Sequence, residues 1–297
     1  MIGDLHCHTR LSNGSMGIED IIILARKRGV GVLAITDRDC QAANERAKIL
    51  GGRSDVRVIA GAEFSALDPD TGREIHILCY DPEFPGRLEE LCKQNLAAAK
   101  RSSQLALMKV STLFSIPPEV LRRCSVGAST LYKQHIMHAL MECGLTDRIY
   151  SDLHDRLFSA DSESNVYAAP SYVPVKTVIE NIHAAEGVAV LAHPALYGDD
   201  TLIDRLIPLG LDGVEVWHPS ASKAVSERLL QKTKAAELLA VGGSDFHGMY
   251  NKQPLQLGDC FTPESYLNEF LSYKTKRRRQ QKKETSAPGG VPDGGSL

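Results

Sequence analysis

The sequence lacks the features that stabilise small secreted proteins or anchor a chain in a membrane. It has only 7 cysteines, an odd number with no Cys-x-x-Cys pair. A disulfide framework and a zinc knuckle are therefore excluded, and reduced, mostly buried thiols are expected. No apolar run reaches the roughly eighteen residues that span a bilayer, and the first residues, MIGDLHCH, lack the basic and apolar regions expected of a signal peptide. We expect a cytoplasmic protein without a membrane segment.

An excess of basic charge is also missing. The 34 Lys and Arg residues are outnumbered by 37 Asp and Glu residues, which gives a formal net charge of -3. An acidic body argues against a dedicated nucleic-acid surface. Residues 274–297 are the exception, because a basic run there is followed by Gly, Pro and Ser. Such a segment buries little apolar area, so we expect a disordered tail.

The hydrophobic content of 43% is sufficient for a large core. Short apolar runs alternate with amphipathic stretches, a pattern that favours parallel β/α repetition. We predict an α/β protein that closes into a barrel. The expected strands are 2–8, 31–37, 56–64, 74–80, 188–193, 211–217 and 239–245, and the helices between them include 17–28, 41–50, 175–186, 202–209 and 221–236.

The β/α alternation is interrupted in the middle of the chain. Residues 88–113, 130–143 and 149–158 have helical periodicity, with no strand pattern between them. We therefore predict a barrel domain formed by residues 1–85 and 174–273, with an inserted helical subdomain at residues 86–173.

Metal-binding residue types gather where the expected strands end, and in a parallel barrel these ends meet on one face. His6 and His8 are two residues apart, so an extended strand directs both imidazoles to one side and Cys7 to the other. We interpret Cys7 as a core residue. The companions of the two histidines are Asp37, Glu63, His76, His193, His218, Asp245 and His247. A set of this size predicts a metal site rather than core histidines.

The ligand types also indicate the chemistry. Imidazole and carboxylate donors without thiolate favour Mn, Fe or Zn. A carboxylate shared by two ions is the usual basis of a two-metal centre, and Glu63 is the candidate bridge. Two ions roughly 3.5–4 Å apart can hold a hydroxide and stabilise a phosphoryl group during displacement. The sequence thus predicts a hydrolase.

Seven segments between Gly3 and Gly248 resemble, in order, the motifs of the PHP family, the polymerase and histidinol phosphatase superfamily of metal-dependent phosphoesterases. They are GDLHCHTRLSNGS, LAITDRD, GAEFS, EIHILCY, VLAHP, GVEVWHP and GGSDFHG. The resemblance implies a distorted seven-stranded (β/α)7 barrel. It also implies that Asp37 orients a ligand, that one ion is held by His6, His8, Glu63 and Asp245, and that a second is held by Glu63, His76 and His193.

The sequence departs from the family pattern at two positions. Residues 12–14 read Ser-Asn-Gly where the family has Ser-Asp-Gly, and residues 36–39 read Thr-Asp-Arg-Asp where it has Thr-Asp-His-Asp. The two replaced residues are ligands of the family's third metal. An amide and a guanidinium, here Asn13 and Arg38, cannot replace a carboxylate and an imidazole as ligands. We expect two divalent ions, with a third site weak or absent.

Several residues are candidates for substrate binding or catalysis. Arg38 offers positive charge and a forked donor for phosphate oxygens, although a structural ion pair is the alternative. His247, without a third ion, could bind phosphate or protonate the leaving oxygen, and we group Asp37 with these two as catalytic. The other candidate substrate-binding residues are Asn13, Lys133, His135 and His218, with a structural role open for each of the last three.

The expected function is hydrolysis of phosphate monoesters of small nucleotides, such as AMP or 3′,5′-bisphosphonucleosides, by a metal-bound hydroxide. The helical insertion resembles that of the nucleotide phosphatase branch of the family, which includes the 3′,5′-nucleoside bisphosphate phosphatases. The alternatives are a 5′-3′ exonuclease on short RNA, a histidinol-phosphate phosphatase and a catalytically silent metal-binding regulatory module. The expected partner is a small phosphorylated substrate, with nucleic acid entering only as short RNA and no obligate protein partner.

Overall fold

The computed structural model describes residues 1–159, 161–199 and 201–286. Strands in these residues form one seven-stranded sheet in which each strand pairs with the next along the chain. This order, with helices between most strands, confirms the α/β class. The strands are β1 (Ile2–Asp4), β2 (Val30–Ile35), β3 (Arg57–Leu67), β4 (Glu74–Tyr80), β5 (Val188–Leu191), β6 (Gly213–Trp217) and β7 (Leu239–Gly242).

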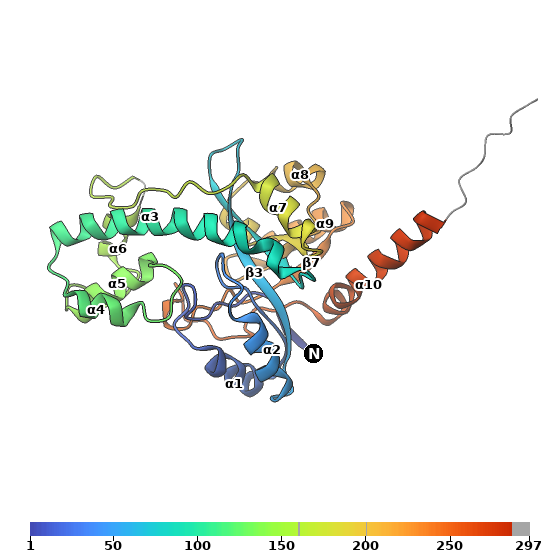
Figure 1. Cartoon of the computed structure of the whole chain (residues 1–297), viewed down its shortest axis with the longest axis horizontal. Coiled ribbons are helices and arrows are strands. Elements are labelled where there is room, and N and C mark those ends of the chain that lie inside the picture. The colour runs from blue at the N-terminus through green and yellow to red at the C-terminus, as the bar shows by residue number, and fades with distance from the viewer. Residues whose placement is uncertain (160, 200, 287–297) are drawn as a thin grey trace, which may run out of the picture.

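Helices surround the sheet, and a separate group of them extends from it (Figure 1). The helices beside the sheet are α1 (Ile18–Arg28), α2 (Asn44–Gly52), α7 (Val175–Ala184), α8 (Leu202–Leu206) and α9 (Lys223–Ala235), with 3-10 turns η2 (Pro194–Leu196), η3 (Ile207–Leu209) and η4 (Gly248–Tyr250). The extended group comprises η1 (Pro85–Leu88), α3 (Glu89–Leu113), α4 (Pro118–Cys124), α5 (Lys133–Glu142) and α6 (Asp152–Phe158).

The sheet closes through the segments that follow its two outer strands. The Leu5 N–H donates to the Gly242 carbonyl oxygen at 3.2 Å, and the His8 N–H donates to the Phe246 carbonyl oxygen at 2.9 Å. Cys7 and Phe246 form a parallel bridge at the same place. Closure therefore occurs at the carboxyl ends of β1 and β7, which is where the candidate site lies.

The expectation of largely parallel strands is wrong for β4, which is antiparallel to both β3 and β5. The short turn after β3 accounts for this, because residues 68–73 allow a hairpin but not a crossover helix. The amino end of β4 consequently lies beside the carboxyl ends of the other strands. His76, near the start of its strand, thereby reaches the same face as residues that follow theirs.

Strand boundaries also differ from the expected ones. β3 continues to Leu67, so Glu63 lies inside the strand and does not close it. β1 ends at Asp4 rather than at residue 8. Even so, Cys7 is fully buried in a cluster with Ile21 and Phe246, which confirms it as a core residue.

The group of helices α3–α6 forms a lobe with a hydrophobic cluster of its own. α3 runs from the barrel to this lobe and carries Ala106 and Val110 into the cluster (Figure 1). The other buried members are Ile136, Met137, Leu140, Ile149, Leu157, Phe158, Val166 and Tyr250. α4 was not among the expected helices, because a seven-residue helix between a proline pair and a glycine shows little periodicity. The limits of a separate subdomain stay a prediction.

The C-terminal segment differs from the disordered tail expected from residue 274. α10 (Glu264–Ser286) continues to residue 286, and the remaining tail positions lie outside the described residues. Phe270 and Leu267 of α10 join the cluster inside the barrel, where the Phe270 and Tyr80 rings meet edge to face. The Arg277 Nη1 atom lies 3.0 Å from Asp212 Oδ1. Within the described residues, no helix has the length and apolar character needed to cross a membrane.

Candidate metal centre

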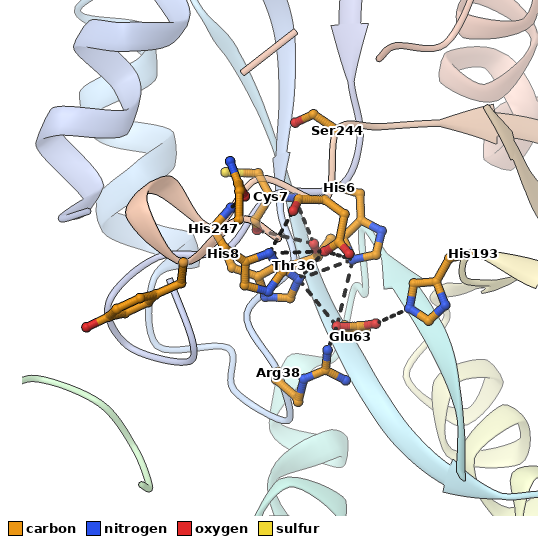
Figure 2. A network of polar contacts seen from close by, with 12 residues as sticks. His6, Cys7, His8, Thr36, Arg38, Glu63, His193, Ser244 and His247 are labelled. Carbon is orange, nitrogen blue, oxygen red and sulfur yellow. Dashed lines mark hydrogen bonds and ion pairs between the residues drawn. The ribbon is translucent and has the colours of Figure 1, made fainter. Parts of the chain in front are cut away.

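All six residues proposed as metal ligands lie together at one end of the barrel. His6 and His8 follow β1, His193 follows β5, and Asp245 follows β7. Glu63 on β3 lies between the His193 ring and the His6 and His8 rings (Figure 2). His193 and Asp245 have φ angles of 31° and 48°. Such left-handed backbone costs about 1–3 kcal/mol per residue and is concentrated at functional sites.

One group of donor atoms faces the Oε2 atom of Glu63. The Nε2 atoms of His6 and His8 lie 3.7 Å and 3.3 Å from this oxygen. The same nitrogens lie 3.3 Å and 3.1 Å from Asp245 Oδ1, and 3.2 Å from one another. Ligands roughly 2.1 Å from a tetrahedral ion stand roughly 3.4 Å apart. This spacing suits a single ion.

A second group faces the other oxygen of the same carboxylate. Glu63 Oε1 lies 3.1 Å from His76 Nδ1 and 3.0 Å from His193 Nε2, and these two nitrogens are 3.2 Å apart. Each oxygen of Glu63 therefore has its own set of nitrogen donors. This is the arrangement that a carboxylate bridging two ions requires.

Unsatisfied buried atoms show that the residues fit cations. Asp245 Oδ1 is buried and accepts no hydrogen bond from the described residues. Glu63 Oε2 likewise accepts none there, although the Arg38 guanidinium forms an ion pair with it at 3.0 Å. A buried carboxylate oxygen without a donor is costly unless a cation lies beside it. A third group of possible donors comprises His8, Asp245 and His247, but it shares two members with the first. Only His247 is an additional donor there.

The pKa values of the histidines follow from burial and from their carboxylate neighbours. Burial lowers the pKa of His8 to about 3 and also lowers the pKa of His193. Both rings therefore stay neutral and keep a lone pair for a cation. Burial opposes charge on His6 too, but Glu215 and Asp245 outweigh it and raise its pKa. A divalent ion at the His6 Nε2 atom would take the place of that proton.

Glu215 lies in β6 within the motif GVEVWHP and is not among the site residues predicted from the sequence. Its Oε1 atom accepts from His6 Nδ1 at 2.9 Å, and its Oε2 atom accepts from the His193 backbone N–H at 2.7 Å. Glu215 is 1% exposed. A carboxylate on the second nitrogen of a ligand histidine fixes its tautomer and orientation. The available signal was a lone Glu in an otherwise apolar strand.

Arg38 is directed at the bridging carboxylate. Its Nη2 atom lies 3.0 Å from Glu63 Oε2, and its Nη1 atom lies 2.6 Å from His76 Nε2. Burial opposes its charge, yet Glu63 and Glu74 outweigh this and raise the Arg38 pKa. Burial likewise opposes charge on Glu63, but Arg38 and His76 outweigh it and lower the Glu63 pKa. Both groups are charged at neutral pH, and the guanidinium also lines a cavity.

Asp37 and Asn13 differ in how they reach the site. Both oxygens of Asp37 accept hydrogen bonds from Thr9 or Ser12, and the Ser12 Oγ atom lies 3.4 Å from His8 Nδ1. Asp37 therefore acts on His8 through Ser12. Asn13 lines the same cavity as Arg38, and its buried Oδ1 atom accepts no hydrogen bond from the described residues.

The two remaining barrel histidines flank Asp245. His247 Nδ1 donates to the Asp245 carbonyl oxygen at 2.7 Å, and its ring stacks on His8 with centroids 4.2 Å apart. His218 Nε2 lies 3.3 Å from Asp245 Oδ2, while its Nδ1 atom contacts Ser220. His218 is 7% exposed, lies beside Asp245 and does not line the cavity beside Arg38, and a part in substrate binding stays a prediction.

A cavity of about 200 Å³ separates the metal-ligand cluster from the helical lobe. Lys133 lines it, with its Nζ atom 3.6 Å from the centre of the Tyr167 ring. The other aromatic side chains in the lining are Tyr132, Phe158 and Tyr172. His135 lies elsewhere. Its Nδ1 atom accepts from the Tyr132 backbone N–H at 3.2 Å, which caps α5, and the residue borders a different cavity beside Tyr250.

Comparisons with known proteins agree with this geometry. No protein-family model matches the sequence. The chain is 32% identical over 256 residues to the phosphoribosyl 1,2-cyclic phosphate 1,2-diphosphodiesterase of Eggerthella lenta, which covers 86% of this chain and 97% of the relative. It is 27% identical over 253 residues to the 3′,5′-nucleoside bisphosphate phosphatase of Chromobacterium violaceum, with 82% and 86% covered.

Two further comparisons extend the set. The chain is 29% identical over 256 residues to the 5′-3′ exoribonuclease Rnm of Escherichia coli, with 83% of this chain and 85% of the relative covered. A crystal structure assigned as a metal-dependent phosphoesterase from Bifidobacterium adolescentis superposes with a TM-score of 0.80 at 29% identity, covering 90% of this chain and 94% of the other. The protein is thus a metal-dependent phosphoesterase, an enzyme that hydrolyses phosphate esters. It belongs to the PHP family.

Proposed function

We propose that this enzyme hydrolyses phosphate monoesters of small nucleotides at a centre of two divalent ions. The observation that carries the proposal is Glu63, whose two carboxylate oxygens face separate sets of donor atoms at 3.0–3.7 Å. His6, His8 and Asp245 would hold one ion with Glu63, and His76 and His193 would hold the other. When bound, Mn, Fe or Zn ions supply positive charge for the phosphoryl group and lower the pKa of water.

The surrounding side chains have separate parts in this reaction. The Arg38 guanidinium binds the phosphoryl oxygens and stabilises their charge as the ester bond breaks. It also supplies positive charge where the family's third ion is expected to be weak or absent. His247 donates its Nδ1 proton to the Asp245 carbonyl, which leaves its Nε2 atom to exchange a proton with the leaving oxygen. Asp37 holds the 9–12 loop and, through Ser12, the His8 ring.

The cavity beside Arg38 supports a nucleotide as the substrate. Tyr132, Tyr167 and Tyr172 offer rings on which a base can stack, and Lys133 offers a charge for a second phosphate. The three curated relatives are named for cyclic phosphoribosyl, nucleoside bisphosphate and RNA substrates, which share a phosphorylated ribose. A cavity of about 200 Å³ is smaller than the roughly 300–1,000 Å³ of drug-sized ligand sites and favours a small molecule over a polymer.

Two broader proposals accompany this one. The lobe of α3–α6 has a hydrophobic cluster distinct from those of the barrel, which supports a separate inserted subdomain at about residues 86–173. The seven cysteines, all free in the structure, support a reducing compartment such as the cytoplasm.

Phosphate release from a panel of esters tests the proposal. The panel contains nucleoside monophosphates, 3′,5′-bisphosphonucleosides, histidinol phosphate and short RNA, with the enzyme reconstituted with Mn2+. We expect the nucleotides to be preferred and Glu63→Ala to lose activity together with both catalytic ions. Glu227→Ala on α9 is the matched control, because the Glu227 side chain is 63% exposed and pairs with Lys223 rather than with a residue of the metal centre. Metal binding without turnover of any ester would instead indicate a silent module.

Similarity to an exoribonuclease supports a second candidate, trimming of short RNA. The basic residues near the end of α10 would then recruit the polymer, and activity on oligonucleotides would fall steeply with rising salt. Lys274 and Arg277 bind Glu83 and Asp212 of the body, so truncation should begin after Arg279. If nucleotide hydrolysis is the function, this truncation leaves turnover of 3′,5′-bisphosphonucleosides unchanged.

A further inference from the structure

Three metal-ligating side chains of different types meet in the helical lobe, away from the barrel site. Cys124 is the last residue of α4, and His138 and Glu142 lie one turn apart on α5. One ligand atom from each lies within 4.8 Å of the other two. Residues four apart on a helix present their side chains on the same face. The packing of α4 on α5 therefore brings the thiol to a ready-made histidine and carboxylate pair.

The hydrogen bonds around His138 fix which of its nitrogens is free. The Tyr250 hydroxyl donates to the Cys124 carbonyl oxygen at 3.3 Å, so its oxygen accepts from His138 Nδ1 at 2.9 Å. With the proton on Nδ1, the Nε2 atom carries a lone pair. That atom lies 3.4 Å from Glu142 Oε1, which is also an acceptor. The Cys124 thiol is hydrogen-bonded to the Glu142 carboxylate, so a cation that replaces the thiol proton would lie among three ligand atoms.

We propose that Cys124, His138 and Glu142 bind a single Zn2+ ion, independently of the catalytic centre. Thiolate, imidazole and carboxylate are all zinc ligands, and three protein ligands leave a fourth position for water. Zn2+ displaces the thiol proton to solvent, and the thiolate and carboxylate together balance its charge. Tyr250 then orients the ligand histidine, as hydrogen-bond acceptors commonly do at zinc sites.

The surroundings make the site accessible and chemically distinct. A cavity of about 350 Å³ is lined by Cys124, His138 and Tyr250, so an ion can enter from it. Arg123 forms an ion pair with Glu142 Oε2, which leaves Oε1 for the metal. Burial and the nearby Glu142 raise the Cys124 pKa to about 11. A thiol must lose its proton to bind a metal ion.

The site would join the lobe to the loop that carries His247. Tyr250 belongs to η4, three residues after His247, and packs in the same hydrophobic cluster as Ile136 and Leu140 of α5. The Ser15 residue of the 9–15 loop and Arg10 border the same cavity. An ion bound by Cys124, His138 and Glu142 would hold α4 against α5. Because Tyr250 hydrogen-bonds to His138 and to the Cys124 carbonyl oxygen, it would also stabilise the position of the segment that carries His247.

Cobalt spectroscopy tests the proposal without relying on activity. Co2+ bound to a thiolate gives a near-ultraviolet charge-transfer band, whereas the proposed catalytic ligands contain no sulfur. Titration of the chelator-treated full-length enzyme with Co2+ should produce this band, and Zn2+ should abolish it. We expect the band to be absent from Cys124→Ser and His138→Gln. It should be retained in Cys143→Ser, a neighbouring cysteine outside the triad, and in Glu63→Ala, which lacks the catalytic bridge.

A second measurement covers the case in which a variant fails to fold, as judged by circular dichroism. Zn2+ should protect Cys124 of the unmodified enzyme from alkylation by iodoacetamide, as mapped by mass spectrometry, and should leave Cys143 unprotected. Absence of both the cobalt band and the zinc protection would overturn the proposal. Loss of the band in Cys143→Ser, or its retention in Cys124→Ser, would also overturn it by assigning the thiolate elsewhere.

Discussion

Glu215 determines which nitrogen of His6 is free to bind a metal ion. Its two oxygens hold His6 Nδ1 and the His193 backbone N–H at 2.9 Å and 2.7 Å. Glu215→Gln replaces a charged acceptor by an amide that can satisfy only one of these donors. We expect metal affinity or activity to fall about 10–100-fold, as is typical for residues behind a metal ligand. Competition with a chromophoric chelator measures the affinity, and Glu227→Gln should leave it unchanged.

Arg38 is the residue that we propose binds the phosphoryl oxygens. Arg38→Ala removes a guanidinium directed at Glu63 Oε2 from 3.0 Å. We expect kcat to fall by about 10²–10³-fold, the usual loss for one preorganised donor, while two ions stay bound. Arg38→Lys should recover only part of the rate, since the ammonium lacks the planar fork. Unaltered kcat in Arg38→Ala would assign the arginine a structural ion pair only.

Asp39 predicts a pH dependence of stability. Burial raises its pKa to about 6 despite hydrogen bonds from Asn95 and Ser65. The folded protein therefore holds the Asp39 proton more tightly than the unfolded chain, whose Asp39 pKa is the ordinary 3.8. The stability that the protonated Asp39 side chain contributes is full below about pH 4 and is lost as the pH rises through 6. In Asp39→Asn this loss is absent. The difference in unfolding free energy between the variant and the unmodified enzyme should therefore change with pH. Between pH 4 and pH 7 it should shift in favour of the variant by up to about 3 kcal/mol.

Urea unfolding at a series of pH values measures this difference. Asparagine also tolerates the left-handed backbone at residue 39, where φ is 50°. Asp55→Asn is the matched control, because Asp55 has φ 55° and its side chain is exposed. A pH profile that is the same for Asp39→Asn and the unmodified enzyme would show that Asp39 carries no such cost.

The candidate metal ligands that the structure brings together could be proposed from the sequence, whereas their hydrogen-bond partners could not. His6, His8 and Glu63 could be singled out because metal-ligand types at the ends of the expected strands are rare by chance and the motifs are specific, although β3 in fact continues beyond Glu63. The role of His135 in capping α5 depends on the bond between Tyr132 N–H and its Nδ1 atom, a local geometry that residue type does not encode. Glu215 was missed because one acid in an apolar strand carries no spacing signal.

At the scale of elements, the reversal of β4 is what completes the second donor set. In a parallel strand the amino end would lie at the far side of the barrel from Glu63. Because β4 is antiparallel, His76 pairs with Ser65 of β3 and places its ring beside the bridge. Sequence periodicity identified this strand but could not give its direction, which depends on the tight 68–73 turn.

α5 lines the cavity beside Arg38, and a substitution there should change substrate affinity without changing metal binding. Lys133, at the first position of α5, lines the cavity beside Arg38, and burial lowers its pKa. Lys133→Ala should raise KM for a 3′,5′-bisphosphonucleoside roughly 10–100-fold, the equivalent of a lost hydrogen bond to a charged group. Metal content should not change. Steady-state kinetics measure KM. Lys109→Ala, at an exposed lysine of α3, is the reference, because it removes the same charge away from the cavity and should leave KM unchanged.

At the scale of the whole molecule, the barrel supplies the ligands and the lobe supplies the wall opposite them. Asn95 of α3 links the two, because its Nδ2 atom donates to Asp39 Oδ1 and to the Ser65 carbonyl oxygen at 2.7 Å each. The barrel and the interrupting helices followed from periodicity. The angle at which α5 faces the barrel mouth depends on such long-range contacts, which is why sequence alone left Lys133 and His135 undecided.

We propose that Glu63 bridges two ions and that no third ion binds beside Asn13 and Arg38. Anomalous diffraction from crystals of the Mn2+-loaded enzyme tests it most directly. The account predicts two peaks at the barrel mouth, one beside each oxygen of Glu63 and roughly 3.5–4 Å apart. A single peak there, or a third peak of equal height beside His247 and Asn13, would contradict it.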